Sequence, residues 1–188
     1  DVTNIDKVPP TKSAPVATAT SNKIVVTSKQ EDFESGIVYE EYAIKKDGVW
    51  TTQQLNNFEG LKSDTVYYVK TISTDLAGNI SESDELEIRT AKMTPGLITF
   101  RKDNSTGETF NVSEDIQAEK NYINNNVYFE VAQGENGKTT YKVTDKDGNE
   151  VSVNEDILKT STGTYVVTAT TTDGTNVIEK TYYILWGD

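Results

Sequence analysis

Two stretches decide the fold: Leu61-Lys62-Ser63-Asp64-Thr65-Val66-Tyr67 in the first half of the chain and Gly163-Thr164-Tyr165-Val166-Val167 in the second. Each places a tyrosine in a strand-forming run late in its half. Both halves also carry runs of β-branched residues separated by Asp-Gly or Gly-Asn turns, which are typical of antiparallel strands. Over 188 residues, this repetition predicts two domains in series and not one large one.

The composition favours strands throughout. Valine and isoleucine together number 31, against 16 for leucine and alanine, and threonine adds 27. β-Branched residues fit a pleated surface better than a helix. The sequence therefore predicts an all-β chain of two tandem antiparallel β-sandwiches.

Charge and missing residue types exclude several functions. The net charge of −12 and the lack of a Lys/Arg block argue against nucleic acid and against direct binding to an anionic membrane. The chain has neither cysteine nor histidine, which removes thiolate catalysis, Cys-ligated zinc and the usual general base near neutral pH. No pair of carboxylates is selected by its spacing, so we expect no enzymatic activity.

The expected organisation is a leader, two sandwiches and a short link. Residues 1–14, with Pro9 and Pro10, are expected to be a linker from an upstream module; residues 15–91 form the first sandwich and residues 92–188 the second. The beginning has no initiator methionine and no apolar signal region, so we expect a longer parent protein. The link at residues 91–95 predicts a restricted hinge. The expected strands cover 16–20, 23–28, 37–44, 58–61, 65–74 and 85–90, then 97–101, 109–112, 127–132, 138–144, 150–153, 164–172 and 176–185.

Two local predictions follow from periodicity. Alternation points Tyr67, Val69 and Thr71 to one face of their strand, which we take as the core face, and gives Tyr165 the same position in the second half. Residues 113–126 are ambiguous, because Ser113 could cap a short helix while tertiary pairing could override it.

The first half resembles fibronectin type III domains of bacterial surface proteins and secreted enzymes. Leu61, Thr65 and Tyr67 match that family's Leu-x-Pro-x-Thr-x-Tyr element, with Ser63 in the proline position. Ser35-Gly36-Ile37 and the run from Thr74 to Ser81 are similar to other signatures of these repeats. The resemblance implies that Leu61 and Tyr67 are structural and that Tyr67 forms a tyrosine corner.

The second half is similar to bacterial Ig-like repeats through residues 147–151 and 163–174, with Thr175-Asn176 where many such repeats carry Gly-Asn. The leader, Asn4 to Pro10, looks like the junction that follows an Ig-like repeat in tandem arrays. The two resemblances imply an extracellular bacterial protein, at the cell surface or secreted.

Asp145, Asp147 and Asn149 are the candidate metal ligands, because oxygen side chains at alternate positions of a tight loop can converge on calcium. The loop departs from an EF-hand at Glu150 and Asp156, so a hairpin turn is the favoured interpretation. No other cofactor is expected. A second acidic group, Asp32 and Glu34 with Asp75, could meet at one end of the first sandwich, although solvated loop acids are the favoured interpretation.

Aromatic residues offer a carbohydrate hypothesis. Trp50, Tyr68, Trp186 and one of Tyr182 or Tyr183 could stack on sugar rings, although cross-strand packing is the simpler explanation. Lys102 and Asn176, near the first and last strands of the second half, are the candidates for an intramolecular crosslink, which would need both side chains in an apolar core.

The function expected from these features is a non-catalytic stalk or spacer that positions a distal adhesive or catalytic module. The alternatives are an adhesin module that binds host protein or glycan through loops, an accessory module of a secreted glycoside hydrolase, and a phage decoration. The expected partners are the neighbouring domains of the same polypeptide. No long apolar edge strand demands an obligate partner, so a monomer is expected.

Overall fold

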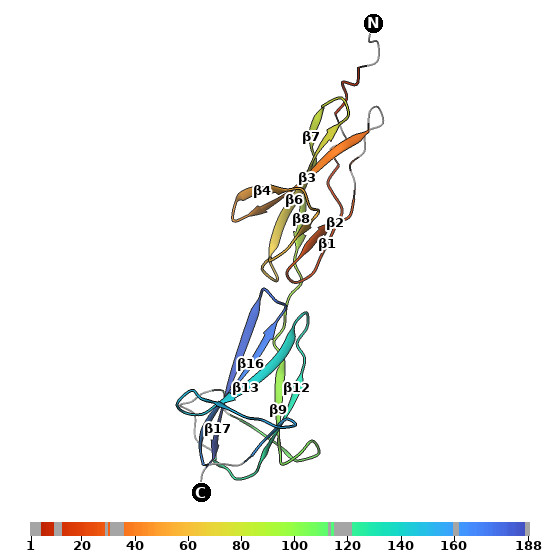
Figure 1. Cartoon of the computed structure of the whole chain (residues 1–188). Helices are drawn as coiled ribbons and strands as arrows, with labels where there is room; N and C mark the ends of the chain where they lie inside the picture. Colours follow the sequence, from red (N-terminus) through yellow and green to blue (C-terminus); the bar gives the residue numbers. More distant parts are fainter. Residues whose placement is uncertain are drawn as a thin grey trace. The chain divides into compact units, whose positions relative to one another are not determined.

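The computed structural model describes residues 5–9, 13–28, 30, 36–112, 114, 122–159 and 162–186 (Figure 1). These residues form strands, turns and loops, with no helix among them. The chain divides into two compact units, Asp1–Lys92 and Met93–Asp188. The boundary expected from the sequence lies one residue earlier. Each unit is a β-sandwich, as predicted.

The first unit packs a small sheet against a larger one. The small sheet has the order β1-β2-β5, and in the larger sheet the order β4-β3-β6-β7 is joined by β8, which pairs with β6. Asp47 and Gly48 have φ of 49° and 79° and close the predicted hairpin between β3 and β4. The strands are β1 (Ala17–Ala19), β2 (Ile24–Val26), β3 (Ile37–Lys46), β4 (Val49–Gln53), β5 (Asn57–Phe58), β6 (Val66–Asp75), β7 (Ile80–Glu82) and β8 (Leu86–Arg89).

The interior of the first unit changes character along β6. Burial alternates strictly along this strand, and Tyr67, Val69 and Thr71 face the interior as the period-two pattern predicts. Beyond Val69 the buried positions of β6 are polar: Thr71, Ser73 and Asp75. The apolar core therefore fills only one end of this sandwich. Its buried members are Ile24, Val26, Ile44, Phe58, Leu61, Tyr67 and Val69.

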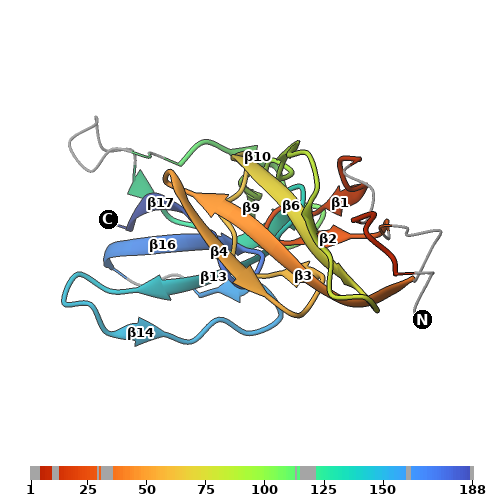
Figure 2. The same ribbon diagram turned by 90° about the horizontal axis from the view of Figure 1, so that it is seen from above.

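The second unit has sheets of four and five strands, with the orders β10-β9-β12-β15 and β11-β17-β16-β13-β14. Figure 2 shows β13 beside β16, with β14 at the edge of the sheet. The pairing is antiparallel except between β11 and β17, which run parallel. The strands are β9 (Leu97–Lys102), β10 (Thr109–Phe110), β11 (Tyr122–Ile123), β12 (Val127–Ala132), β13 (Lys138–Thr144), β14 (Glu150–Val151), β15 (Ile157–Leu158), β16 (Gly163–Thr172) and β17 (Val177–Trp186).

The core of the second unit is apolar except at one end, where Thr139 and Thr171 are buried with their hydroxyls 2.8 Å apart. Phe100 lies edge-on to Phe129 and to Tyr182, with ring centroids 5.6 Å and 5.1 Å away. Tyr165 is buried in the same cluster. The other buried members are Ile98, Val127, Val143, Leu158, Val167, Ala169 and Ile184.

The structure corrects several expected elements. The strand expected at 58–61 ends at Phe58, because Gly60, at φ 68°, turns the chain and Leu61 packs into the core from a loop. The strand expected at 150–153 ends at Val151. The ambiguous stretch 113–126 lies mostly outside the described residues, but its residues 122–123 form β11 and not a helix.

Candidate functional site

The connection between the units is short, and its first part is bonded to the first unit. The Ala91 N–H donates to the Thr20 carbonyl at 3.0 Å, and the Ala91 carbonyl accepts from the Asp64 N–H at 3.1 Å. The Thr90 hydroxyl donates to the Lys62 carbonyl at 2.6 Å. The chain is therefore fixed to the first unit as far as Ala91.

The second part of the connection is bonded to the second unit. The Thr94 N–H donates to the Glu135 carbonyl at 3.1 Å, and the Glu135 N–H donates back to the Thr94 hydroxyl at 2.7 Å. The Gly96 N–H donates to the Thr171 hydroxyl at 2.8 Å. A Cβ on Gly96 would overlap the Thr139 hydroxyl, so only glycine fits there. Two residues, Lys92 and Met93, separate Ala91 from Thr94.

Three turns share one hydrogen-bonding pattern, in which an aspartate carboxylate accepts hydrogen bonds from an asparagine that follows it. The Asp145 carboxylate accepts from the backbone N–H groups of Asp147 and Asn149, both at 2.9 Å, and the Asn149 amide lies 3.4 Å from its second oxygen. Asp75 with Asn79 and Asp173 with Asn176 repeat this pattern at 2.7 to 2.8 Å. Such Asx turns replace missing backbone hydrogen bonds at hairpin ends.

The candidate calcium ligands Asp145, Asp147 and Asn149 belong to one exposed turn. The Asp145 carboxylate already accepts hydrogen bonds from two backbone N–H groups of that turn. Backbone donation from Asn149 lowers the pKa of Asp145, followed by donation from Asp147. A cation would have to compete with these N–H donors. In the described part of the chain, no group of three or more His, Cys, Asp or Glu side chains is placed to hold a metal.

The candidate sugar-stacking aromatics belong to two sheets. Trp50 and Tyr68 lie on the outer face of the large sheet of the first unit, where each faces a lysine. The Lys70 ammonium lies 4.3 Å from the centroid of the Trp50 ring and 3.2 Å from Glu82, and the Lys45 ammonium lies 5.9 Å from the Tyr68 centroid. One face of the Trp50 ring is therefore already occupied.

In the second unit, Tyr182 is the buried member of its pair and Tyr183 the outward, half-buried one. Trp186 ends β17, and its side chain lies outside the described part.

Of the two remaining candidate clusters, the structure leaves the acidic one untested and separates the crosslink pair. Asp32 and Glu34 fall outside the described residues, while Asp75 is buried and bonded to Asn79. Lys102, at the end of β9, lies 3.4 Å from Glu108, and Asn176 is bonded to Asp173 in the turn before β17. Because Gly96, before the start of β9, bonds Thr171 near that turn, the two crosslink candidates lie toward opposite ends of the sandwich.

The first unit has a polar interior that was not predicted from the sequence. Glu40 pairs in register with Ser73, which pairs with Ser81, and the Tyr42 hydroxyl donates to Glu40 at 3.0 Å. The Ser73 and Ser81 hydroxyls are buried and have no hydrogen-bond partner among the described residues. Alternation along β6 was the available signal, since it places Ser73 and Asp75 on the same face as Val69.

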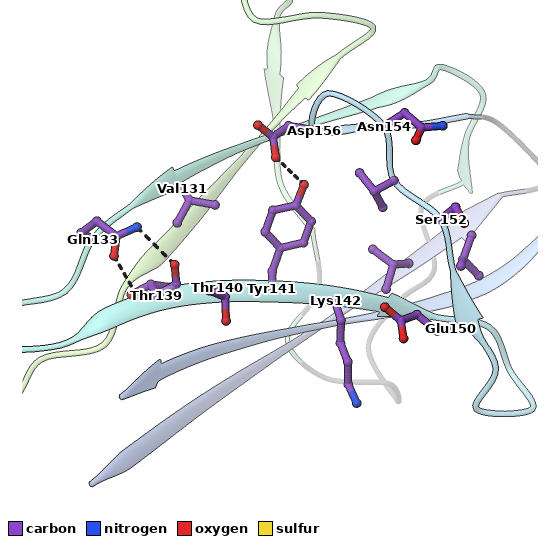
Figure 3. A pocket seen from close by; sticks show the side chains of 13 residues that line it. Val131, Gln133, Thr139, Thr140, Tyr141, Lys142, Glu150, Ser152, Asn154 and Asp156 are labelled. Carbon is purple, nitrogen blue, oxygen red and sulfur yellow. Dashed lines mark hydrogen bonds between the residues drawn. The ribbon is translucent and has the colours of Figure 1, made fainter. Parts of the chain in front are cut away.

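A groove of about 650 Å³ in the second unit, which was also not predicted, lies between β13 and the segment that follows β14 (Figure 3). The Tyr141 ring rises from β13 and its hydroxyl donates to Asp156 at 2.7 Å. Burial, followed by this hydrogen bond to Asp156, raises the pKa of Tyr141 above its usual value. At the end of the groove, Gln133 is bonded to Thr139.

No protein-family model matches the chain, and no curated protein matches it. Among the described residues, no helix is long and apolar enough to cross a membrane.

Proposed function

We propose that the chain is a non-catalytic spacer within a larger extracellular bacterial surface or secreted protein, where it positions a distal adhesive or catalytic module. The observation that carries this proposal is the connection between the units. Hydrogen bonds hold the chain to the first unit as far as Ala91 and to the second from Thr94. A connection with so few residues between these two anchored positions restricts motion, and restricted motion is what a spacer requires.

Three further features support the proposal. Tyr67 makes the hydrogen bond expected of a tyrosine corner, accepting from the Lys62 N–H at 2.9 Å, as the resemblance to fibronectin type III domains implies. Asx turns add side-chain hydrogen bonds at the ends of several hairpins, which stabilises a module that has no disulfide. The net charge of −12 keeps neighbouring modules soluble and apart.

The test measures the distribution of distances between the units. Because the chain has no cysteine, the exposed residues Glu87 and Thr140 can be changed to Cys and spin-labelled without background. We expect a narrow distance distribution by pulsed electron spin resonance. The matched control inserts Gly-Gly-Ser-Gly between Lys92 and Met93 and should broaden the distribution at least twofold, roughly as a flexible linker does. A native distribution as broad as that of the control would refute the spacer proposal.

A further inference from the structure

One position on the edge of β13 has backbone groups without a ladder partner. On the side away from β16, the Thr139 N–H donates to Gln133 Oε1 at 2.7 Å and the Thr139 carbonyl accepts from Gln133 Nε2 at 3.2 Å. On the same side, Val143 pairs with Val151 of β14. Tyr141 lies between these two residues. Alternation in an antiparallel sheet directs its N–H and carbonyl to this side too.

Strand β14 stops pairing with β13 just before it would reach Tyr141. After Val151 it departs from β13 and reaches the other sheet, where Ile157 and Leu158 pair with β12. Within the described part of the chain, the ladder partner of Tyr141 is Ala169 on β16, and no residue pairs with it on the groove side. One N–H and one carbonyl therefore face the groove of about 650 Å³.

The groove has a floor that suits the side chains of an added strand. Val131, Tyr141, Val151 and Val153 line it and are partly buried against the core. Figure 3 shows the Tyr141 ring standing between β13 and Asp156, with Gln133 reaching Thr139 beside it. Alternate side chains of an extended segment would point onto this floor, since successive side chains of a strand face opposite ways.

We propose that this groove binds an extended peptide segment, which adds to the edge of β13 at Tyr141. The Gln133 carboxamide already acts there as a peptide unit, since it gives one donor and one acceptor to Thr139. Tyr141 is the next residue of β13 whose backbone groups point to this side, and they face the groove. Unpaired strand edges are natural sites of strand addition, in which backbone hydrogen bonds give affinity and side-chain pockets give specificity.

The charge of the unit selects the partner. Residues 93–188 carry 8 Lys and Arg against 15 Asp and Glu, a net charge of −7. Beside the groove, Glu150 and Asp156 are exposed, against one lysine of its lining, Lys142. Complementary charge speeds and orients association. The fitting occupant is therefore a basic segment of another protein, with small apolar residues at alternate positions.

The probe for this proposal is the blocked peptide acetyl-Lys-Thr-Val-Thr-Val-Thr-Lys-amide, added to the full chain and followed by amide NMR. In the free chain we expect the Tyr141 amide to exchange with solvent much faster than that of Val143. On addition of peptide, the signals of residues 139–143 should shift and exchange at Tyr141 should slow about tenfold or more. The matched peptide, N-methylated at its valines and central threonine, should bind much more weakly, because none of its three central residues can donate to the edge.

Two variants locate the site on the protein. Ser152 lines the groove and is exposed, so Ser152→Trp should fold normally and weaken peptide binding about tenfold by filling the groove. Ser105→Trp, an exposed change in the turn after β9, should leave binding unchanged. Both spectra also report folding directly.

Four outcomes would overturn the proposal: a Tyr141 amide already as protected as that of Val143, no binding at about 1 mM peptide, equal binding of the N-methylated peptide, or equal binding by Ser152→Trp. Self-association of the chain that Ser152→Trp abolishes would also overturn it, by assigning the groove to a second copy. None of these results bears on the distance distribution that tests the spacer.

Discussion

At the residue scale, Tyr67 joins the apolar core of the first unit to the loop before β6. Its ring is 6 % exposed, and its hydroxyl accepts the Lys62 N–H at 2.9 Å. Tyr67→Phe keeps the ring but leaves that backbone donor without its acceptor. We expect the free energy of unfolding of the first unit to fall by about 1 kcal/mol, measured by urea titration.

Tyr39→Phe is the control for this prediction. The Tyr39 hydroxyl also makes hydrogen bonds, to Glu41 and Gln54, but its side chain is 42 % exposed and water can replace them. The expected change is within about 0.5 kcal/mol. Equal effects of the two substitutions would show that the hydrogen bond at Tyr67 stabilises the first unit no more than an exposed one does.

Tyr42 makes the first unit sensitive to alkali. Burial, then the hydrogen bond and charge of Glu40, raises the pKa of Tyr42 to about 12, against about 10 in an unfolded chain. The unfolded state therefore loses this proton first as the pH rises. The stabilisation by neutral Tyr42 is fully present below about pH 10 and is lost as the pH rises toward about 12.

The measurement is the melting temperature of the first unit between pH 9 and about pH 12, compared with Tyr42→Phe. We expect a steeper fall in the native chain than in the variant, because phenylalanine has no proton to lose. Tyr141 adds a similar slope to the second unit, so the transition followed must be that of the first. Parallel curves would contradict the assignment to Tyr42.

At the scale of elements, the outer face of the large sheet of the first unit holds a small cluster of its own. Lys70 of β6 lies between the Trp50 ring of β4 and Glu82 of β7, and its side chain is only 16 % exposed. A double-mutant cycle with Trp50→Leu and Lys70→Gln should give a coupling energy of about 0.5 to 1 kcal/mol.

The chain contains its own control for this cycle. Lys45 lies over Tyr68 on the same face, at 5.9 Å against 4.3 Å for Lys70 over Trp50. Tyr68→Leu with Lys45→Gln should therefore give the smaller coupling, when both cycles are measured by urea titration in the same buffer. A larger coupling for the Tyr68 pair would show that the distance to the ring does not govern this interaction.

The long strands were predicted from the sequence, and the short strands β7, β11 and β15 were missed. Strands such as β6 and β16 carry ten residues of alternating burial, enough for the period to fix both the strand and its face. Strands β7, β11 and β15 have two or three residues, too few to show a period. The inward position of Glu40 follows a register shift between Ile37 and Tyr39, which local sequence does not reveal.

The groove was not predictable for a related reason. It exists because the chain leaves β13 after Val151 and because Gln133 reaches the backbone of Thr139. Both are choices of tertiary pairing, and the residues involved are ordinary loop residues. The Asp145 turn, in contrast, was predictable from Asp-Gly alone, while the partners of its carboxylate needed the structure.

At the scale of the whole molecule, the two units have separate cores. The buried cluster of the first unit contains residues from 24 to 69, and that of the second contains residues from 98 to 184. Two valines occupy similar places in them, Val69 and Val167, each 0 % exposed on an inner strand of its sheet. The same substitution, valine to alanine, can therefore be made in each core to test whether the two units unfold independently.

Val69→Ala should lower the stability of the first unit by about 2 to 3 kcal/mol, the cost of removing two buried methyl groups and leaving a cavity. Each unit has one tryptophan, Trp50 or Trp186, so replacing the other by Phe makes fluorescence report one unit at a time. In urea, we expect Val69→Ala to move the transition reported by Trp50 and to leave that reported by Trp186 within about 0.5 kcal/mol. Val167→Ala should do the reverse. If either change moved both transitions equally, the two units would unfold as one. Any restriction of motion between them would then have to come from energetic coupling between the units, and not from the shortness of the connection.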